Sequence, residues 1–272
     1  MYYMDKLTER KAQITKLNIM DDTFFHKIVE DKETCEEIIR VLMQNKELRL
    51  ISSRAQFSLR NSGTKSSVLD AVCMDEDSRY YNIEVQKAER DDYQRRMRYN
   101  SSNLDTYFTE KGIKYAQLPD VYLFFLSDFD LFEAGETVYH VERRIRETGA
   151  KVDNGVYEIY INTKVDDGSE IAEMMKYFTD SNGRHPLFPK LSERVMYFKE
   201  VKKGVAEMSG VVEEYAKEYA KEYAKKCLEE RERQIVEEML RTGAALEYIS
   251  KVTGYSIERI EKIQEELFAC VN

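Results

Sequence analysis

Tryptophan is absent from this sequence, and proline, histidine and cysteine are scarce. The 272 residues include 3 prolines, 3 histidines, 4 cysteines and 11 glycines, which excludes collagen-like and low-complexity chains. No run of eighteen apolar residues is present, so no segment is suited to cross a membrane as a helix. The cysteines lack Cys-x-x-Cys spacing, so we expect reduced thiols and no cluster of zinc ligands.

The beginning of the chain lacks the uninterrupted apolar region of a secretory signal. Charges recur there at Lys6, Glu9, Arg10 and Lys11, and we therefore expect a cytoplasmic protein. The formal net charge of −9 argues against a surface that binds nucleic acid everywhere, because such binding depends on Lys and Arg that neutralise phosphates. It leaves room for a local basic groove, since clustered metal-binding carboxylates would add acidity to a nuclease.

Hydrophobic periodicity predicts an α/β protein with two parts. The spacing of apolar residues predicts one broken helix or two short helices over 21–44, a β-hairpin over 66–86, a helix over 91–111, a buried strand over 121–126, strands at 137–142 and 156–163, and helices at 169–180 and 191–209. We expect a core domain over residues 1–200 and a helical extension over residues 201–272.

The extension has an unusual composition. Residues 214–225 repeat Glu-Tyr-Ala-Lys three times, and this period of four makes the tyrosine stripe drift by about 40° per repeat around a helix. A solvated connecting helix is favoured over a dimerising one. Residues 245–260 have the helix, glycine turn and helix pattern of a helix-turn-helix, but the acidic second segment favours a packing or oligomerisation role over reading DNA.

The hairpin carries the most informative polar residues. Glu84 and Gln86 lie on one face of its second strand, because successive side chains of a strand alternate. A turn between Glu76 and Asp77 places Asp70 opposite residue 83 or 84. Asp70 lies in an apolar strand, where a carboxylate needs a partner or a metal, and two adjacent carboxylates are the ligands that Mg²⁺ takes together with water and phosphate. The alternative is that Asp70 is an ordinary solvent-facing residue, and spacing alone leaves both open.

Three segments resemble one known family. The hairpin, from Gly63-Thr64-Lys65-Ser66 to Asn82-Ile83-Glu84-Val85-Gln86, resembles the PD-(D/E)XK nuclease superfamily, in particular its putative transposases and recombination-promoting nucleases. Residues 21–27 look like the opening Asp-x-x-Phe-Lys motif of that family, and residues 95–105 look like its arginine-rich helix. The resemblance implies a restriction-endonuclease-like α/β core, with a mixed sheet flanked by helices and an α-helical C-terminal extension.

The resemblance also implies an active site. In it Asp70 and Glu84 bind Mg²⁺, for which Mn²⁺ is a substitute, and Asp22 contributes a further acid. Gln86 stands where the superfamily more often has lysine. The ammonium group of lysine stabilises developing negative charge, whereas an amide is neutral. We therefore expect either a slow enzyme or one in which a second cation, such as Lys65 or Arg96, takes over that role. His26 is interpreted as a surface or packing histidine, because hydrolysis at a metal needs no histidine.

The arginine-rich helix has two interpretations. Arg96 and Arg98 are suited to contact the phosphates of DNA, together with Lys65, and Tyr99 to stack on a base. Equally, the arginines pair with nearby acids such as Asp91 and Asp92, and Tyr99 simply packs.

The function indicated is a Mg²⁺-dependent DNA endonuclease that serves recombination or a mobile element. The alternative is a weak or inactive DNA-binding or protein-interaction module that keeps the nuclease fold, as the acidic composition and Gln86 suggest. DNA is the expected partner, no membrane is involved, and residues 201–272 give a weak preference for a homodimer.

Overall fold

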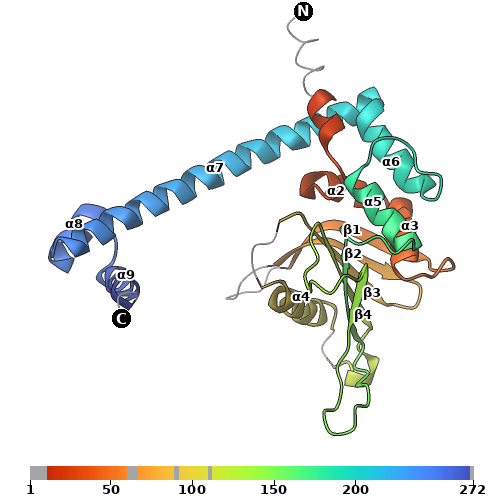
Figure 1. The fold of residues 1–272 in the computed structure, drawn as a ribbon, viewed down its shortest axis with the longest axis horizontal. Coiled ribbons are helices and arrows are strands. Elements are labelled where there is room, and N and C mark those ends of the chain that lie inside the picture. Colours follow the sequence, from red (N-terminus) through yellow and green to blue (C-terminus); the bar gives the residue numbers. More distant parts are fainter. Residues whose placement is uncertain (1–10, 60–66, 89–91, 110–111, 270–272) are drawn as a thin grey trace, which may run out of the picture. The chain divides into compact units, whose positions relative to one another are not determined.

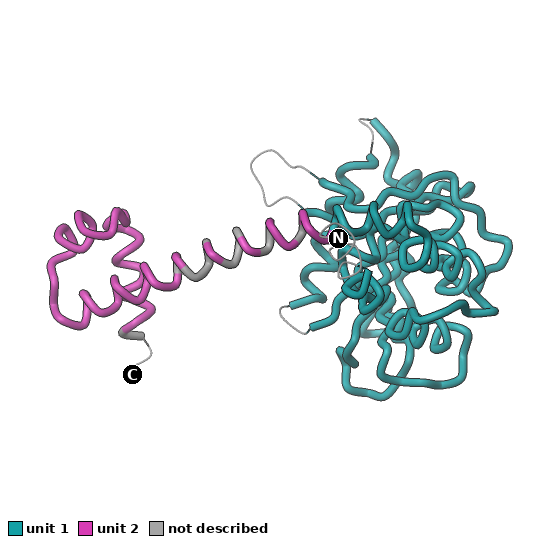
Figure 2. The backbone as a smooth tube through the Cα atoms, turned by 90° about the horizontal axis from the view of Figure 1, so that it is seen from above, with its two compact units in different colours: residues 1–211 teal, residues 212–272 magenta. Residues whose placement is uncertain are grey.

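The computed structural model describes residues 11–59, 67–88, 92–109 and 112–269. The chain divides into two compact units, Met1–Val211 and Val212–Asn272 (Figure 2), and each is described by itself. The predicted boundary after residue 200 stays a prediction. Among the described residues, no helix combines the length and apolar character that crossing a membrane would need.

The first unit is built on a mixed sheet of six strands (Figure 1). The strands are β1 (Leu50–Leu59), β2 (Ser67–Asp75), β3 (Tyr80–Gln86), β4 (Val121–Ser127), β5 (Val138–Val141) and β6 (Val156–Asn162), in the order β1-β2-β3-β4-β6-β5. Neighbours β1, β2 and β3 are antiparallel, whereas β4 pairs in parallel with both β3 and β6. The predicted mixed sheet flanked by helices is confirmed, as are the hairpin and the three later strands.

Helices cover both faces of the sheet. The helices are α2 (Asp22–Val29), α3 (Lys32–Leu42), α4 (Tyr93–Phe108), α5 (Glu170–Thr179) and α6 (Pro189–Glu200). In Figure 1, α2, α3, α5 and α6 lie on one side of the sheet and α4 on the other. Residues of β4 pack on both sides: Leu123 and Phe125 join Met97 of α4 in one apolar cluster, and Phe124 is also fully buried. This double burial explains the unbroken apolar run of β4.

Two boundaries follow from local chemistry. The stretch 21–44 divides into α2 and α3 because the Asp31 side chain caps α3, accepting a hydrogen bond from the Thr34 backbone N–H at 2.9 Å. The predicted helix over 191–209 is wrong as one element, since α6 ends at Glu200 and α7 (Lys202–Arg241) follows. At that break the backbone of Gly204 lies so close to Tyr197 that a Cβ would come within 2.1 Å of the Tyr197 carbonyl oxygen.

Strand β1 was not predicted from the sequence. It pairs with β2 along most of its length, but it carries Ser52, Ser53, Arg54 and Gln56, and its exposures do not alternate regularly. An irregular register between Leu50 and Ser52 interrupts the period of two. The pattern of this strand is therefore set by its partner rather than by its own sequence.

The second unit contains the end of α7 with α8 (Leu246–Thr253) and α9 (Ile257–Ala269). The predicted helix, glycine turn and helix are confirmed, and Gly254 ends α8 with a φ of +74°. A small buried cluster holds the helices together, formed by Val236, Leu240, Ile249, Tyr255, Ile260 and Ile263. This favours the packing role predicted for the tail. The side chains of Tyr215, Tyr219 and Tyr223, which form the repeat, lie outside what the structure describes.

We predict that two adjacent positions of β2 differ sharply in their effect on stability. Leu69 is fully buried and Val68 is 55% exposed. The Leu69→Ala substitution should lower the free energy of unfolding by about 2–5 kcal/mol, because it leaves a cavity in the core. Val68→Ala should change it by no more than about 0.5 kcal/mol. Urea denaturation followed by circular dichroism measures both, and equal losses would contradict the assignment of the buried face.

Candidate functional site

The candidate site lies where β2 and β3 separate. Regular pairing of these strands ends at Ala71 and Ile83. Beyond these residues, hydrogen bonds to side-chain carboxylates replace those between the two backbones. The Val85 backbone N–H donates to Asp70 Oδ2 at 2.9 Å, and the Asp70 N–H points to Glu84 Oε1 at 3.4 Å. The two carboxylates singled out in the sequence are thus neighbours, held in an interruption of the sheet.

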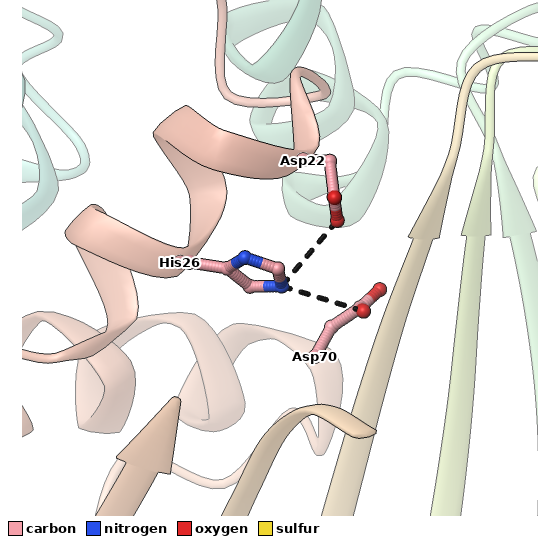
Figure 3. A group of neighbouring side chains, drawn as sticks. All are labelled: Asp22, His26 and Asp70. Carbon is pink, nitrogen blue, oxygen red and sulfur yellow. Dashed lines mark hydrogen bonds and ion pairs between the residues drawn. The ribbon is translucent and has the colours of Figure 1, made fainter. Parts of the chain in front are cut away.

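Helix α2 brings two more side chains to Asp70. Asp22 and His26 are four residues apart and share one face of the helix. His26 Nε2 lies 3.3 Å from Asp22 Oδ1 and 3.4 Å from Asp70 Oδ1 (Figure 3). The imidazole is buried, whereas about half of the Asp22 side chain is exposed. The structure therefore brings both Asp22 and His26 next to Asp70.

Helix α4 supplies the counterion of Glu84. The Arg96 guanidinium forms an ion pair with Glu84 Oε2, and Asn82 Nδ2 donates to Glu84 Oε1 at 3.1 Å. Glu84 is 1% exposed, while the Arg96 side chain remains 41% exposed. One side of Arg96 is thus committed to the protein and the other faces solvent.

Burial and neighbouring carboxylates together shift the pKa values of the site. Burial, and then the neighbouring Asp70 carboxylate, raise the pKa of Glu84 to about 8, against the opposing effects of Arg96 and Asn82. Burial and Asp70 also raise the pKa of Asp22. For His26, burial lowers the pKa, but the hydrogen bond to Asp70 and the surrounding carboxylates outweigh it and raise the pKa overall. The shift of His26 shows that the carboxylates around it favour a positive charge at that position.

The remaining predicted residues occupy different surroundings. Gln86 is partly exposed and its Nε2 donates to the Ala88 carbonyl oxygen at 3.1 Å, so its amide group is engaged at the end of its own strand. On α4, Arg98 is exposed and Tyr99 is half-buried. Lys65 lies outside the described residues.

Sequence reasoning missed two contributors. His26 was interpreted as a packing residue, although its spacing of four from Asp22 on a helix was a readable signal. Lys87, directly after Gln86, forms an ion pair with Asp21. It brings an ammonium group to the residue next to Asp22, and nothing in the sequence linked these two segments.

The donor set fits a divalent cation. The side chains of Asp22, His26 and Asp70 each offer one ligand atom, and these atoms all lie within 4.8 Å of one another. Three carboxylates, Asp22, Asp70 and Glu84, face the single guanidinium of Arg96 in this network. When the three carboxylates are ionised and His26 is neutral, two negative charges are uncompensated, which is the charge that a divalent ion supplies.

We predict that Arg96 stabilises the metal-free protein through Glu84. Arg96→Leu leaves the buried carboxylate without its guanidinium and should lower the free energy of unfolding by about 1–3 kcal/mol. The double variant Arg96→Leu/Glu84→Gln should regain part of this loss, because the unpaired charge is gone. Urea denaturation at pH 9 with a chelator measures both, because Glu84, whose pKa is raised to about 8, is ionised there.

The neighbouring arginine gives a matched control. Arg95 is 78% exposed and pairs with Asp92 at the surface, so Arg95→Leu should change stability by less than about 0.5 kcal/mol. A double variant no more stable than Arg96→Leu alone would show that Glu84 is not the group stabilised.

Comparison with known proteins finds a similarity in the central part of the chain. No curated protein and no solved structure matches it. One family model does, that of the PD-(D/E)XK nuclease family transposases, over residues 46–164. The match contains all six strands of the described sheet together with Asp70, Glu84 and Arg96, and it leaves α2 outside. The resemblance expected from the sequence is thereby confirmed: residues 46–164 match the model of the PD-(D/E)XK nuclease family transposases, and this match suggests a nuclease-like function.

Proposed function

We propose that this protein is a metal-dependent endonuclease that hydrolyses phosphodiester bonds of DNA. The observation that carries the proposal is the pair of carboxylates Asp70 and Glu84 at the break between β2 and β3, inside the segment that matches a nuclease family. Mg²⁺ is the proposed cofactor, with Mn²⁺ as a substitute. Recombination or the movement of a mobile element is the proposed setting, in the cytoplasm.

Asp70 and Glu84 are the residues proposed to hold the cation, with Asp22 as the additional acid. When bound, a divalent cation lowers the pKa of water and neutralises charge on the phosphate. The protein contributes the geometry: the Val85 N–H fixes one oxygen of Asp70, and Asn82 fixes one oxygen of Glu84. Gln86 is proposed to position the attacking water through its amide oxygen, because its bond to the Ala88 carbonyl uses only an N–H of the amide.

Positive groups near the carboxylates are suited to bind the DNA backbone. Arg96 keeps 41% of its side chain exposed while it pairs with Glu84, and Arg98 is exposed on the same helix. Contacts of this kind fix the position of a nucleic acid without reading its sequence. We include Lys65 in the proposed DNA surface as a contact to phosphate and Tyr99 as a residue that stacks on a base, as the sequence predicts.

We predict that the protein nicks supercoiled plasmid DNA in the presence of Mg²⁺ or Mn²⁺. Asp70→Asn and Glu84→Gln should each reduce the rate by orders of magnitude, because each removes a charged ligand from the cation. Gel electrophoresis of the plasmid measures the rate. Glu47→Gln provides the control, since Glu47 is an exposed acid on the loop before β1, and it should nick like the wild type. Equal nicking by all four proteins would contradict the assigned site.

The second candidate is a DNA-binding or protein-interaction module that has lost catalysis. Two contacts favour it: the Gln86 amide is engaged with the Ala88 carbonyl, and Arg96 occupies one oxygen of Glu84. Such a protein would bind a DNA duplex in the presence of Ca²⁺, which supports no cleavage, and would leave the plasmid intact with Mg²⁺ and Mn²⁺.

We also propose a weakly associating homodimer with residues 201–272 at the interface. Cutting both strands of DNA requires two active sites of this kind, and residues 212–272 of this tail form a compact unit separate from the one that holds the site. We predict a mass above that of one chain in light scattering at micromolar concentration. A single-chain mass at every concentration tested would contradict the dimer.

A further inference from the structure

The donor atoms around His26 have the spacing of ligands on one metal ion. Its Nε2 lies 3.3 Å from Asp22 Oδ1 and 3.4 Å from Asp70 Oδ1. Two atoms that bind the same ion at about 2.1 Å are separated by about 3.0–3.4 Å in octahedral or tetrahedral geometry. The three side chains therefore need little rearrangement to share an ion (Figure 3).

The elements hold these donors in place. Asp22 and His26 project from successive turns of α2, whose Phe24, Phe25 and Ile28 are fully buried. The second oxygen of Asp70 is fixed by the Val85 N–H, so Oδ1 is left toward the histidine. Paired ligands at i and i+4 on a helix, completed by a third residue from elsewhere, are a common way to build a site for a transition metal.

Binding of a metal ion through Nε2 requires that nitrogen to carry no proton. His26 Nδ1 is buried and has no hydrogen-bond partner among the described residues. Moving the proton from Nε2 to Nδ1 breaks no hydrogen bond at Nδ1, but it gives up the contact of Nε2 with Asp70, so the bond between Nε2 and the ion must replace that contact. Nε2 is then free to present its lone pair between the two carboxylates.

We propose that Asp22, His26 and Asp70 bind one divalent transition-metal ion, with His26 Nε2 as a nitrogen ligand. The inference rests on the proposed function only in taking Asp70 to be a metal ligand. An imidazole nitrogen is a better ligand for transition-metal ions, among them Zn²⁺ and more weakly Mn²⁺, than for Mg²⁺, which prefers oxygen. His26 thus selects Mn²⁺ over Mg²⁺, and Asp70 lies between this position and Glu84.

The competing explanation is that His26 only bridges the two carboxylates as a hydrogen-bond donor. The His26→Gln substitution separates the two roles. The amide of glutamine reaches about as far as Nε2 and still donates hydrogen bonds, but it offers no nitrogen lone pair to a metal. His26→Phe is the second variant, which keeps an aromatic ring in the buried position if glutamine does not fold.

Isothermal titration of the full chain with MnCl₂ and MgCl₂ tests the proposal. The wild type should bind Mn²⁺ at least about 10-fold more tightly than Mg²⁺. His26→Gln should lose about 10-fold or more in Mn²⁺ affinity, since even the partners that orient a ligand are worth about 10–100-fold. Its Mg²⁺ affinity should change little. His140→Gln is the control, because His140 is exposed on β5 and should leave both affinities unchanged.

Pulsed electron paramagnetic resonance of bound Mn²⁺ gives a readout that a structural role would not move. Nitrogen modulation should be present in the wild type and the His140→Gln control and absent in His26→Gln. If the modulation is missing from the wild type, or if His26→Gln binds Mn²⁺ normally, the proposal is overturned.

The outcomes of this experiment and of the plasmid assay are separable. A protein that cuts DNA but shows no nitrogen ligand keeps the proposed function and loses this inference. A protein that binds Mn²⁺ through nitrogen and cuts no DNA keeps the inference and loses the proposed function.

Discussion

The site depends on burying carboxylates between two strands without leaving them unpaired. Burial of an ionised group is costly unless it is hydrogen-bonded and compensated, and Glu84 is almost completely buried. Its oxygens are satisfied by Arg96 from α4 and by Asn82 from its own strand. Asp70 is satisfied by the Val85 N–H and approaches His26 from α2. Side chains from α4 and α2, which lie on opposite faces of the sheet, therefore reach the same place, where the regular hydrogen bonding between β2 and β3 is interrupted.

Much of this fold is readable from local patterns. The alternation in β2 and β3 and the unbroken run of β4 predict the centre of the sheet, because side-chain periodicity reports which faces are buried. The same alternation, with the position of the turn, brings Asp70 and Glu84 together. Strand β1 escapes this reasoning because its polar residues carry no clear period and its pairing is imposed by β2.

The roles of individual polar residues are less readable, since they depend on neighbours distant in the sequence. The arginine cluster on α4 predicts a DNA surface or surface ion pairs, but Arg96 instead pairs with a buried carboxylate twelve residues before it. His26 looks like a packing residue when only its own helix is considered. Its functional environment comes from Asp70, which is 44 residues further along the chain.

Helix α2 depends on neighbouring helices for its stability. With eight residues it is too short to be stable in isolation, and its Phe24 and Phe25 rings lie against Phe198 of α6 and Phe178 of α5. The helices that support Asp22 and His26 thus follow the sheet in the chain, beyond the segment that matches the family. The matching segment therefore does not contain the whole site. A genetic exchange that moved only residues 46–164 into another chain would transfer Asp70, Glu84 and Arg96 but would leave Asp22 and His26 on α2 behind.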